Sequence, residues 1–138
     1  MKFDGLGRAT ESFKALGHPA RLRILAMLRG GGLCVCQVTA MLGLAVSTVS
    51  AHLAELRRAG LVLERKDGRW VTYSLSKDAA TSALLRDVWA LLGNDRQVQA
   101  DGRLGRRLRR VPVEELCRVD FDVTRVGLKR RAVRREKE

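Results

Sequence analysis

The three cysteines are the residues of this sequence best suited to bind or react with a small ligand. Cys34 and Cys36 are separated by one residue, and Cys117 lies far along the chain. Thiolates are soft ligands that prefer As(III), Sb(III), Cd(II), Pb(II), Cu(I) and Zn(II) to hard cations, and they also react with oxidants. An odd number of cysteines argues against a disulfide framework. These residues indicate a metal-binding or redox-sensing site, with inert packing of the thiols as the alternative.

The spacing of Cys34 and Cys36 raises a geometric difficulty. Apolar periodicity predicts a helix over residues 33–42 that carries both thiols. Residues two apart on an ideal helix lie about 200° apart around its axis. Both sulfurs therefore face one ion only if the helix start unwinds or the motif stays in the preceding loop. We hypothesise that ligand binding distorts this helix, which supports the helix that follows it.

The elements around this motif are predicted to be mostly helical. Apolar stripes and Gly or Pro breaks indicate helices over residues 9–16, 20–29, 46–59 and 77–92, with Ser76 as the N-cap of the last. Residues 61–66 and 69–75 are β-rich and are separated by Asp67-Gly68, which predicts a hairpin. Two helices joined by a tight turn and followed by a hairpin form a winged helix-turn-helix, so the fold class is mainly α with a β-hairpin wing.

Composition narrows the class of partner. The chain has 138 residues, with 27 Lys and Arg against 15 Asp and Glu, a net charge of +12 that favours a polyanion. It has no apolar run long enough for a membrane span and no secretory leader, so we expect a cytoplasmic protein without a membrane partner. We find no phosphate-binding glycine loop and no nucleophile with its base. The sequence thus argues against an enzyme and predicts no organic cofactor.

The second helix of the predicted pair has the composition of a DNA-reading helix. Its buried face would hold Val49, Leu53 and Leu56, while small hydrogen-bonding side chains lie on the other positions. Basic residues follow later in this helix and around the hairpin tip, where phosphates would be contacted. The alternative for each residue alone is a helix cap or a solvated surface. The predicted DNA-binding residues are Ser47, Thr48, Ser50, His52, Arg57, Arg65, Lys66 and Arg69.

Three stretches of the sequence resemble the ArsR/SmtB family of repressors, and in particular its arsenic-responsive branch. They are residues 13–25, the Leu-Cys-Val-Cys-Gln-Val segment of residues 33–38, and residues 49–62 with the hairpin that follows. The resemblance covers about residues 8–95 in the family's order. It implies a homodimer built largely from the first and last helices, which represses a resistance operon. Thr48 and Ala51 are smaller than the Arg or Lys that the family often has at exposed recognition positions.

The resemblance also bears on the ligand set. The arsenic-responsive pattern commonly has a third cysteine three residues after the second, and this sequence has Thr39 there. Cys117 is the remaining thiol, so we expect it to fold back, within the subunit or across the dimer, as the third ligand beside Cys34 and Cys36. Three sulfurs in a pyramid suit As(III), whereas Zn(II) requires a fourth ligand.

These observations predict a homodimeric repressor that binds an inverted-repeat DNA operator and is released by As(III) or Sb(III). The alternatives are a thiol-redox or Cd/Pb/Zn-responsive repressor of the same fold, and a general nucleic-acid-binding protein. Residues 1–100 are expected to form the winged helix-turn-helix and dimerisation domain. Residues 101–138, which hold 13 of the 27 basic residues, are expected to form a partly disordered basic extension.

Overall fold

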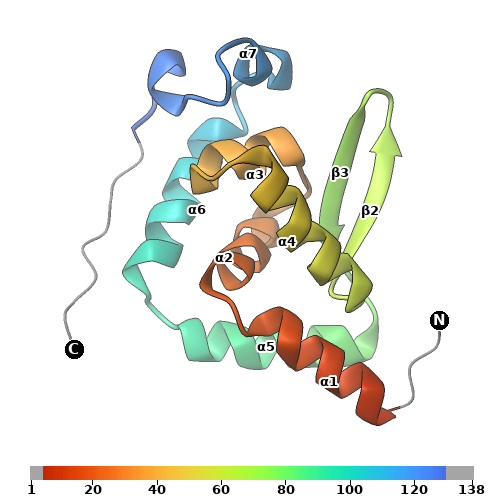
Figure 1. Ribbon diagram of the computed structural model, residues 1–138. Helices are drawn as coiled ribbons and strands as arrows, with labels where there is room; N and C mark the ends of the chain where they lie inside the picture. The colour runs from red at the N-terminus through yellow and green to blue at the C-terminus, as the bar shows by residue number, and fades with distance from the viewer. Residues whose placement is uncertain (1–4, 130–138) are drawn as a thin grey trace.

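The computed structural model of the protein describes residues 5–129 and is mainly helical (Figure 1). Its helices pack around α2, and a small sheet lies at one side. The elements in chain order are α1 (Gly5–Leu16), α2 (Pro19–Met27), η1 (Leu28–Gly30), β1 (Leu33–Cys34), α3 (Val35–Leu42), α4 (Val46–Arg58), β2 (Val62–Asp67), β3 (Trp70–Leu75), α5 (Ala79–Leu92), α6 (Arg96–Leu108), α7 (Val113–Arg118) and η2 (Val123–Val126).

Helices α3 and α4 form the helix-turn-helix that the sequence predicts. Their axes are bent by 115° at the connection, within the usual range for this motif. Val49, Leu53 and Leu56 are fully buried on one face of α4, as their spacing requires. Gly60 ends the helix region with a left-handed backbone, φ +76°, which a residue with a Cβ adopts poorly. The predicted recognition helix is confirmed.

The sheet is a three-stranded antiparallel sheet in the order β1-β3-β2. The hairpin of β2 and β3 closes with the pair Asp67 and Trp70, so Gly68 and Arg69 form the two-residue loop. Strand β1 adds to the free edge of β3, where Leu33 pairs with Tyr73 and Cys34 with Thr72. The wing is therefore tied directly to the segment that carries the first two cysteines.

Two predicted helix starts were placed wrongly. The third helix does not begin at Leu33, because Leu33 and Cys34 pair with β3 and only Val35 begins α3. The fifth helix is capped by Asp78 rather than Ser76. The Asp78 carboxylate accepts the backbone N–H of Thr81 at 2.9 Å, and the Ser76 hydroxyl donates to the same carboxylate at 2.8 Å.

The expected division between residues 100 and 101 falls inside α6 and is a further correction. Leu104, Leu108 and Leu116 are buried in the common core, so the chain up to residue 129 is not a separate extension. The buried face of α6 holds Asp101, Leu104, Gly105 and Leu108. Because only the two leucines carry large apolar side chains, the sequence shows no clear apolar periodicity for this helix. The rest of the expected extension, residues 130–138, lies outside the described residues.

No helix of the described chain is by itself long and apolar enough to cross a membrane. The bent pair of α3 and α4 has the necessary length and composition, but Val38, Val49 and Leu53 of this pair are fully buried in the core.

Candidate thiol site and nucleic-acid interface

The thiol site lies where α3, α7 and the end of β1 meet. The Cys36 Sγ and Cys117 Sγ atoms are 3.2 Å apart within one subunit, although 81 positions separate them in the chain. Helix α7 packs on α3 and brings Cys117 to this place. Cys34 is buried, while Cys36 and Cys117 are partly exposed, and all three are free thiols. The three sequence-predicted thiols are thus gathered in one region.

Cys34 does not lie in the helix, and this removes the premise of the helix-distortion hypothesis. It is the N-cap residue of α3, with an extended backbone, and the side chain of Gln37 accepts its backbone N–H at 3.0 Å. Cys36 lies one residue inside the helix. The 200° separation therefore does not apply to the pair, and the chain need not unwind for the two sulfurs to approach one ion.

The chemical state of Cys36 follows from its surroundings. Burial, the contact with the Cys117 thiol and the electrostatic effects of Cys34 and Cys117 together raise the pKa of Cys36 to about 12. Cys36 is therefore a neutral thiol at pH 7. A ligand must replace its proton when it binds sulfur.

The site is not a preformed three-ligand cage. Among residues 5–129, no three His, Cys, Asp or Glu side chains are arranged to hold a metal ion. The sulfurs of Cys36 and Cys117 are in contact. The thiol of Cys34, at the helix N-cap, contributes to the raised pKa of Cys36. Thr39, which stands where the local third thiol was expected, is buried, and its hydroxyl has no hydrogen-bond partner.

The exposed face of α4 carries three of the predicted DNA-binding residues. Ser47, Thr48 and Ser50 are exposed around the first turn and a half, opposite the buried Val49. The N-cap residue, Ala45, supplies no side-chain acceptor to the first-turn N–H groups. This end of α4 thus offers hydroxyls and backbone donors, the groups that contact base edges and phosphates.

His52 was predicted to face DNA, and the structure turns it toward α2 instead. Its ring lies 4.4 Å from the ring of His18, and its Nδ1 is 3.3 Å from Arg21 Nη1. Burial, His18 and the Arg21 charge lower the pKa of His52 below its usual value. His52 thus packs at the α2–α4 contact, and its contact with DNA stays a prediction.

The remaining predicted contacts lie at the end of α4 and along the hairpin. Arg57 is exposed and pairs with Glu64 of β2 at 3.0 Å, so it links the helix to the wing. Arg65, Lys66 and Arg69 are exposed near the hairpin tip. Arg69 lies over the Trp70 ring at 5.5 Å, which orients its guanidinium at the tip.

Two positioning arginines were not identified from the sequence. Arg21 donates to the carbonyl oxygens of Ala15 at 2.7 Å and Lys14 at 3.0 Å, at the end of α1, and it also contacts His52. Arg109 donates to the carbonyl oxygens of Met27, Gly31 and Gly32 and fixes the loop before β1. Main-chain acceptors in loops leave no sequence pattern, so these roles were not predictable.

Comparisons with known proteins agree with this fold. A family model described as bacterial regulatory protein, arsR family, matches residues 18–63. The arsenic resistance transcriptional regulator ArsR1 of Pseudomonas putida is 40% identical over 79 residues, 55% of this chain and 62% of that protein. The arsenical resistance operon repressor of Escherichia coli is 40% identical over 80 residues, 56% of this chain and 68% of that protein. Reduced HlyU from Vibrio cholerae has a TM-score of 0.56 at 37% identity, over 63% of this chain and 90% of that chain.

The fold and these likenesses define a winged helix-turn-helix transcriptional regulator whose partner is DNA, and not an enzyme. The chain belongs to the ArsR family of bacterial regulators. This family consists of transcriptional regulators. Membership in it therefore gives no support to the alternative of a general nucleic-acid-binding protein. Cys117 lies beyond the residues that the family model matches.

Proposed function

We propose that this regulator is a repressor that binds an inverted-repeat operator as a homodimer and leaves it when As(III) or Sb(III) binds Cys34, Cys36 and Cys117. The observation that carries the proposal is the 3.2 Å contact of Cys36 and Cys117 Sγ beside Cys34. Three sulfurs match the trivalent, pyramidal coordination of these metalloids. Zn(II) would require a fourth ligand besides the three thiols.

The position of Cys34 supports coupling to DNA binding. Cys34 lies between β1, which pairs with the wing, and α3, which packs on the recognition helix. A bond from Cys34 to an ion held by Cys36 and Cys117 requires movement of its side chain, because the three thiols are not preformed as a cage. The movement would act at the junction of both DNA-reading elements, and this is the coupling that release requires.

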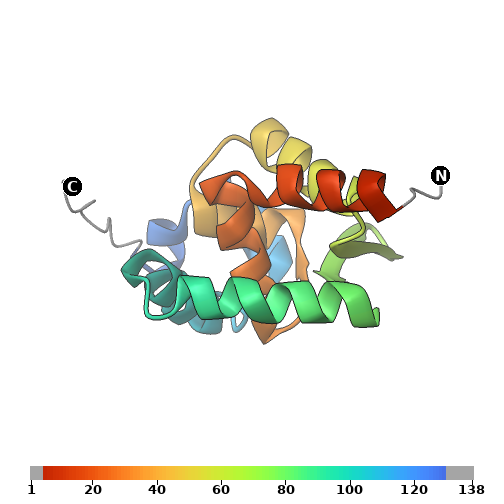
Figure 2. The same cartoon turned by 90° about the horizontal axis from the view of Figure 1, so that it is seen from below.

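The surface of α1 and α5 supports the homodimer. The two helices run alongside each other on the lower side of the molecule, as Figure 2 shows. Leu6 and Phe13 of α1 and Leu91 of α5 are 81%, 66% and 87% exposed, and a groove of about 240 Å³ lies between the two helices. Large exposed apolar side chains on adjoining helices are typical of a protein interface. A second copy of this chain is the occupant we propose.

The test is operator release, followed by fluorescence anisotropy with DNA from the promoter of the protein's own gene. As(III) is expected to release the wild type, and Cys34→Ser, Cys36→Ser and Cys117→Ser are each expected to need roughly tenfold more or to resist. Cd(II) and Zn(II) are titrated in parallel. A full response of Cys117→Ser to As(III) would remove Cys117 from the ligand set.

A rescue variant makes this test sharper. Residue 39 is three positions after Cys36 on the same face of α3, so Thr39→Cys puts a thiol beside Cys36. Cys117→Ser with Thr39→Cys is expected to regain the As(III) response. Cys117→Ser with Thr39→Ala is the matched control and is expected to stay unresponsive.

A second candidate function, a thiol-redox switch, is favoured by the same sulfur–sulfur contact. A hydroperoxide would oxidise the Cys36 and Cys117 thiols to one disulfide, and the peroxide would be reduced to an alcohol and water. The raised pKa of Cys36 argues against rapid oxidation, because the thiolate is the nucleophile. Cys34→Ser separates the two functions: it would abolish release by As(III) but leave release by hydroperoxide intact.

A further inference from the structure

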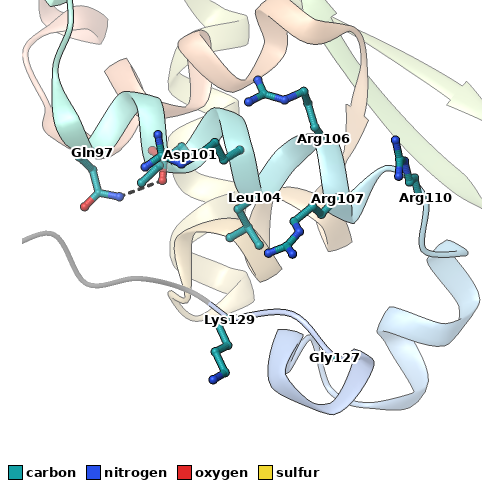
Figure 3. Close-up of a pocket in the computed structure, with 10 residues that line it drawn as sticks. Gln97, Asp101, Leu104, Arg106, Arg107, Arg110, Gly127 and Lys129 are labelled. Atoms are coloured by element: carbon teal, nitrogen blue, oxygen red, sulfur yellow. Dashed lines mark hydrogen bonds between the residues drawn. The ribbon is translucent and has the colours of Figure 1, made fainter.

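A cavity of about 690 Å³ lies between α6 and the segment that ends the described chain (Figure 3). Its lining is dominated by cationic side chains, with Ala100, Leu104 and Gly127 between them. In Figure 3 the Arg107 side chain reaches from α6 toward the Gly127–Lys129 segment. The cations that line the cavity are Arg103, Arg106, Arg107, Arg110 and Lys129.

Four arginines near the C-terminal end of α6, here called the stripe, line the cavity. Arg103, Arg106 and Arg107 lie in the helix at the spacing i, i+3, i+4, and Arg110 lies in the turn that follows Leu108. Arg23 of α2 holds Asp101 through bonds of 2.8 Å and 2.9 Å, and this fixes the rotation of α6 about its axis. Arg109, which is off the stripe, turns instead to the loop before β1.

No carboxylate of residues 5–129 neutralises the stripe. None of the five lining cations makes an ion pair within these residues, and the lining carboxylate, that of Asp101, is bound by Arg23 and Gln97. Like charges three and four residues apart destabilise a helix. The excess of positive charge along this cavity therefore favours an anion.

We propose that this cavity binds a small soluble ligand with at least two linked phosphate groups. Guanidinium groups bind phosphate oxygens in pairs of parallel hydrogen bonds, and a single phosphate with a charge of about −1.5 to −2 leaves most of the five cations unmatched. The volume lies within the range of small-molecule sites. Helix α6, which lines the cavity, lies on the side of α2 opposite the β2–β3 hairpin (Figure 1), away from the wing.

Calorimetric titration of the full chain at about 0.15 M salt tests the proposal, with tripolyphosphate, pyrophosphate and orthophosphate as probes. Tripolyphosphate is expected to bind saturably at one per protomer and orthophosphate at least about tenfold more weakly. Arg107→Gln with Arg110→Gln is expected to weaken tripolyphosphate binding by about tenfold or more. Lys77→Gln with Arg86→Gln, which removes two exposed charges elsewhere, is the matched control and is expected to bind within about twofold of wild type.

Equal weakening in the two double variants would overturn the proposal, because it would show that net charge alone binds the probe. Loss of operator affinity in the Arg107/Arg110 variant, without loss of tripolyphosphate binding, would assign the stripe to DNA phosphates instead. Amide shifts of Ala100, Leu104 and Gly127, which line the cavity, on addition of tripolyphosphate to wild type locate the binding independently of any variant. Cys36→Ser is expected to bind the probe as wild type does, so failure of the thiol proposal leaves this one intact.

Discussion

At the scale of single residues, the neutral thiol of Cys36 should give As(III) and divalent cations different proton balances on binding. When As(OH)₃ binds three thiols, three As–S bonds form, three As–O bonds break, and each hydroxide leaves with a thiol proton as water. When Cd(II) binds a thiol, the proton goes to the solvent. Because the pKa of Cys36 is raised to about 12, binding of a divalent cation must displace its proton at neutral pH.

We therefore predict that As(III) binding is nearly independent of pH between about 6 and 8, whereas Cd(II) binding weakens as the pH falls. Calorimetry in two buffers of different ionisation enthalpy measures the protons released. We expect close to none for As(III) and at least one for Cd(II), with one fewer for Cd(II) in Cys36→Ser. Release of protons by As(III) would contradict the exchange written above.

His52 gives a second prediction at this scale, on stability. Its pKa is lowered in the folded protein by burial, by His18 and by Arg21, so the unfolded chain takes up a proton that the folded protein resists. The stabilising contribution of neutral His52 is present above the unfolded pKa of about 6.5 and is lost as the pH falls below it. Thermal melts from pH 7.5 to 5 should show a smaller decrease in Tm for His52→Asn than for wild type. Ser50→Asn, at an exposed position of the same helix, should melt with the wild-type pH dependence.

At the scale of elements, the Arg23–Asp101 pair is the contact that joins α2 to α6. Asp101 is 4% exposed and Arg23 23% exposed at the side chain. Removing one partner of a buried pair leaves the other charge poorly solvated. Asp101→Ala should lower the free energy of unfolding by about 2–3 kcal/mol, somewhat less than a fully buried pair because Arg23 reaches solvent. Chemical denaturation measures this value.

Glu115→Ala is the control for that prediction. Glu115 and Arg118 form an exposed ion pair three residues apart at 3.7 Å. Such pairs contribute about 0–1 kcal/mol, so this variant should unfold within about 0.5 kcal/mol of wild type. A loss as large as that of Asp101→Ala would show that general charge, not the α2–α6 bond, sets the stability.

The Arg23–Asp101 pair also explains why some elements could be predicted from the sequence and others could not. Helices α2 and α4 and the hairpin show apolar periodicity or turn residues, and the sequence predicted them within a few residues. Helix α6 buries a charge and a glycine: Asp101 is neutralised by a residue 78 positions away, and a Cβ at Gly105 would lie 2.8 Å from Met41 Cε. A local sequence pattern cannot show that a buried charge or glycine is accommodated by residues far away in the chain. The strand at Cys34 was missed for a similar reason, because its partner is β3.

At the scale of the whole molecule, the thiol site, the DNA-reading elements and the arginine-lined cavity occupy different parts of one core. The sequence predicted that Cys34, Cys36 and Cys117 act together. It could not show that Cys117 reaches Cys36 within the subunit, since that contact depends on α6 and α7 packing against α3.

The α1–α5 surface gives the prediction that belongs to this scale. Leu91→Glu introduces a charge at the proposed dimer contact and should weaken the dimer by roughly a hundredfold or more, since a buried unpaired charge is strongly unfavourable. Operator affinity should fall with it. Sedimentation velocity over a concentration series measures the first effect and anisotropy the second. Leu63→Glu, an exposed leucine of the wing, should sediment as wild type; an unchanged Leu91→Glu dimer would rule out this surface.

The contact of Cys36 with Cys117 has a consequence for chain connectivity. An ion bound to both sulfurs would close a covalent loop of about 80 residues that contains the recognition helix, the wing, α5 and α6. Closing a loop of that length removes unfolded-chain entropy equivalent to about 4.5 kcal/mol. The inducer would thus act as a removable cross-link, and the form of the protein that has left DNA would be the one hardest to unfold.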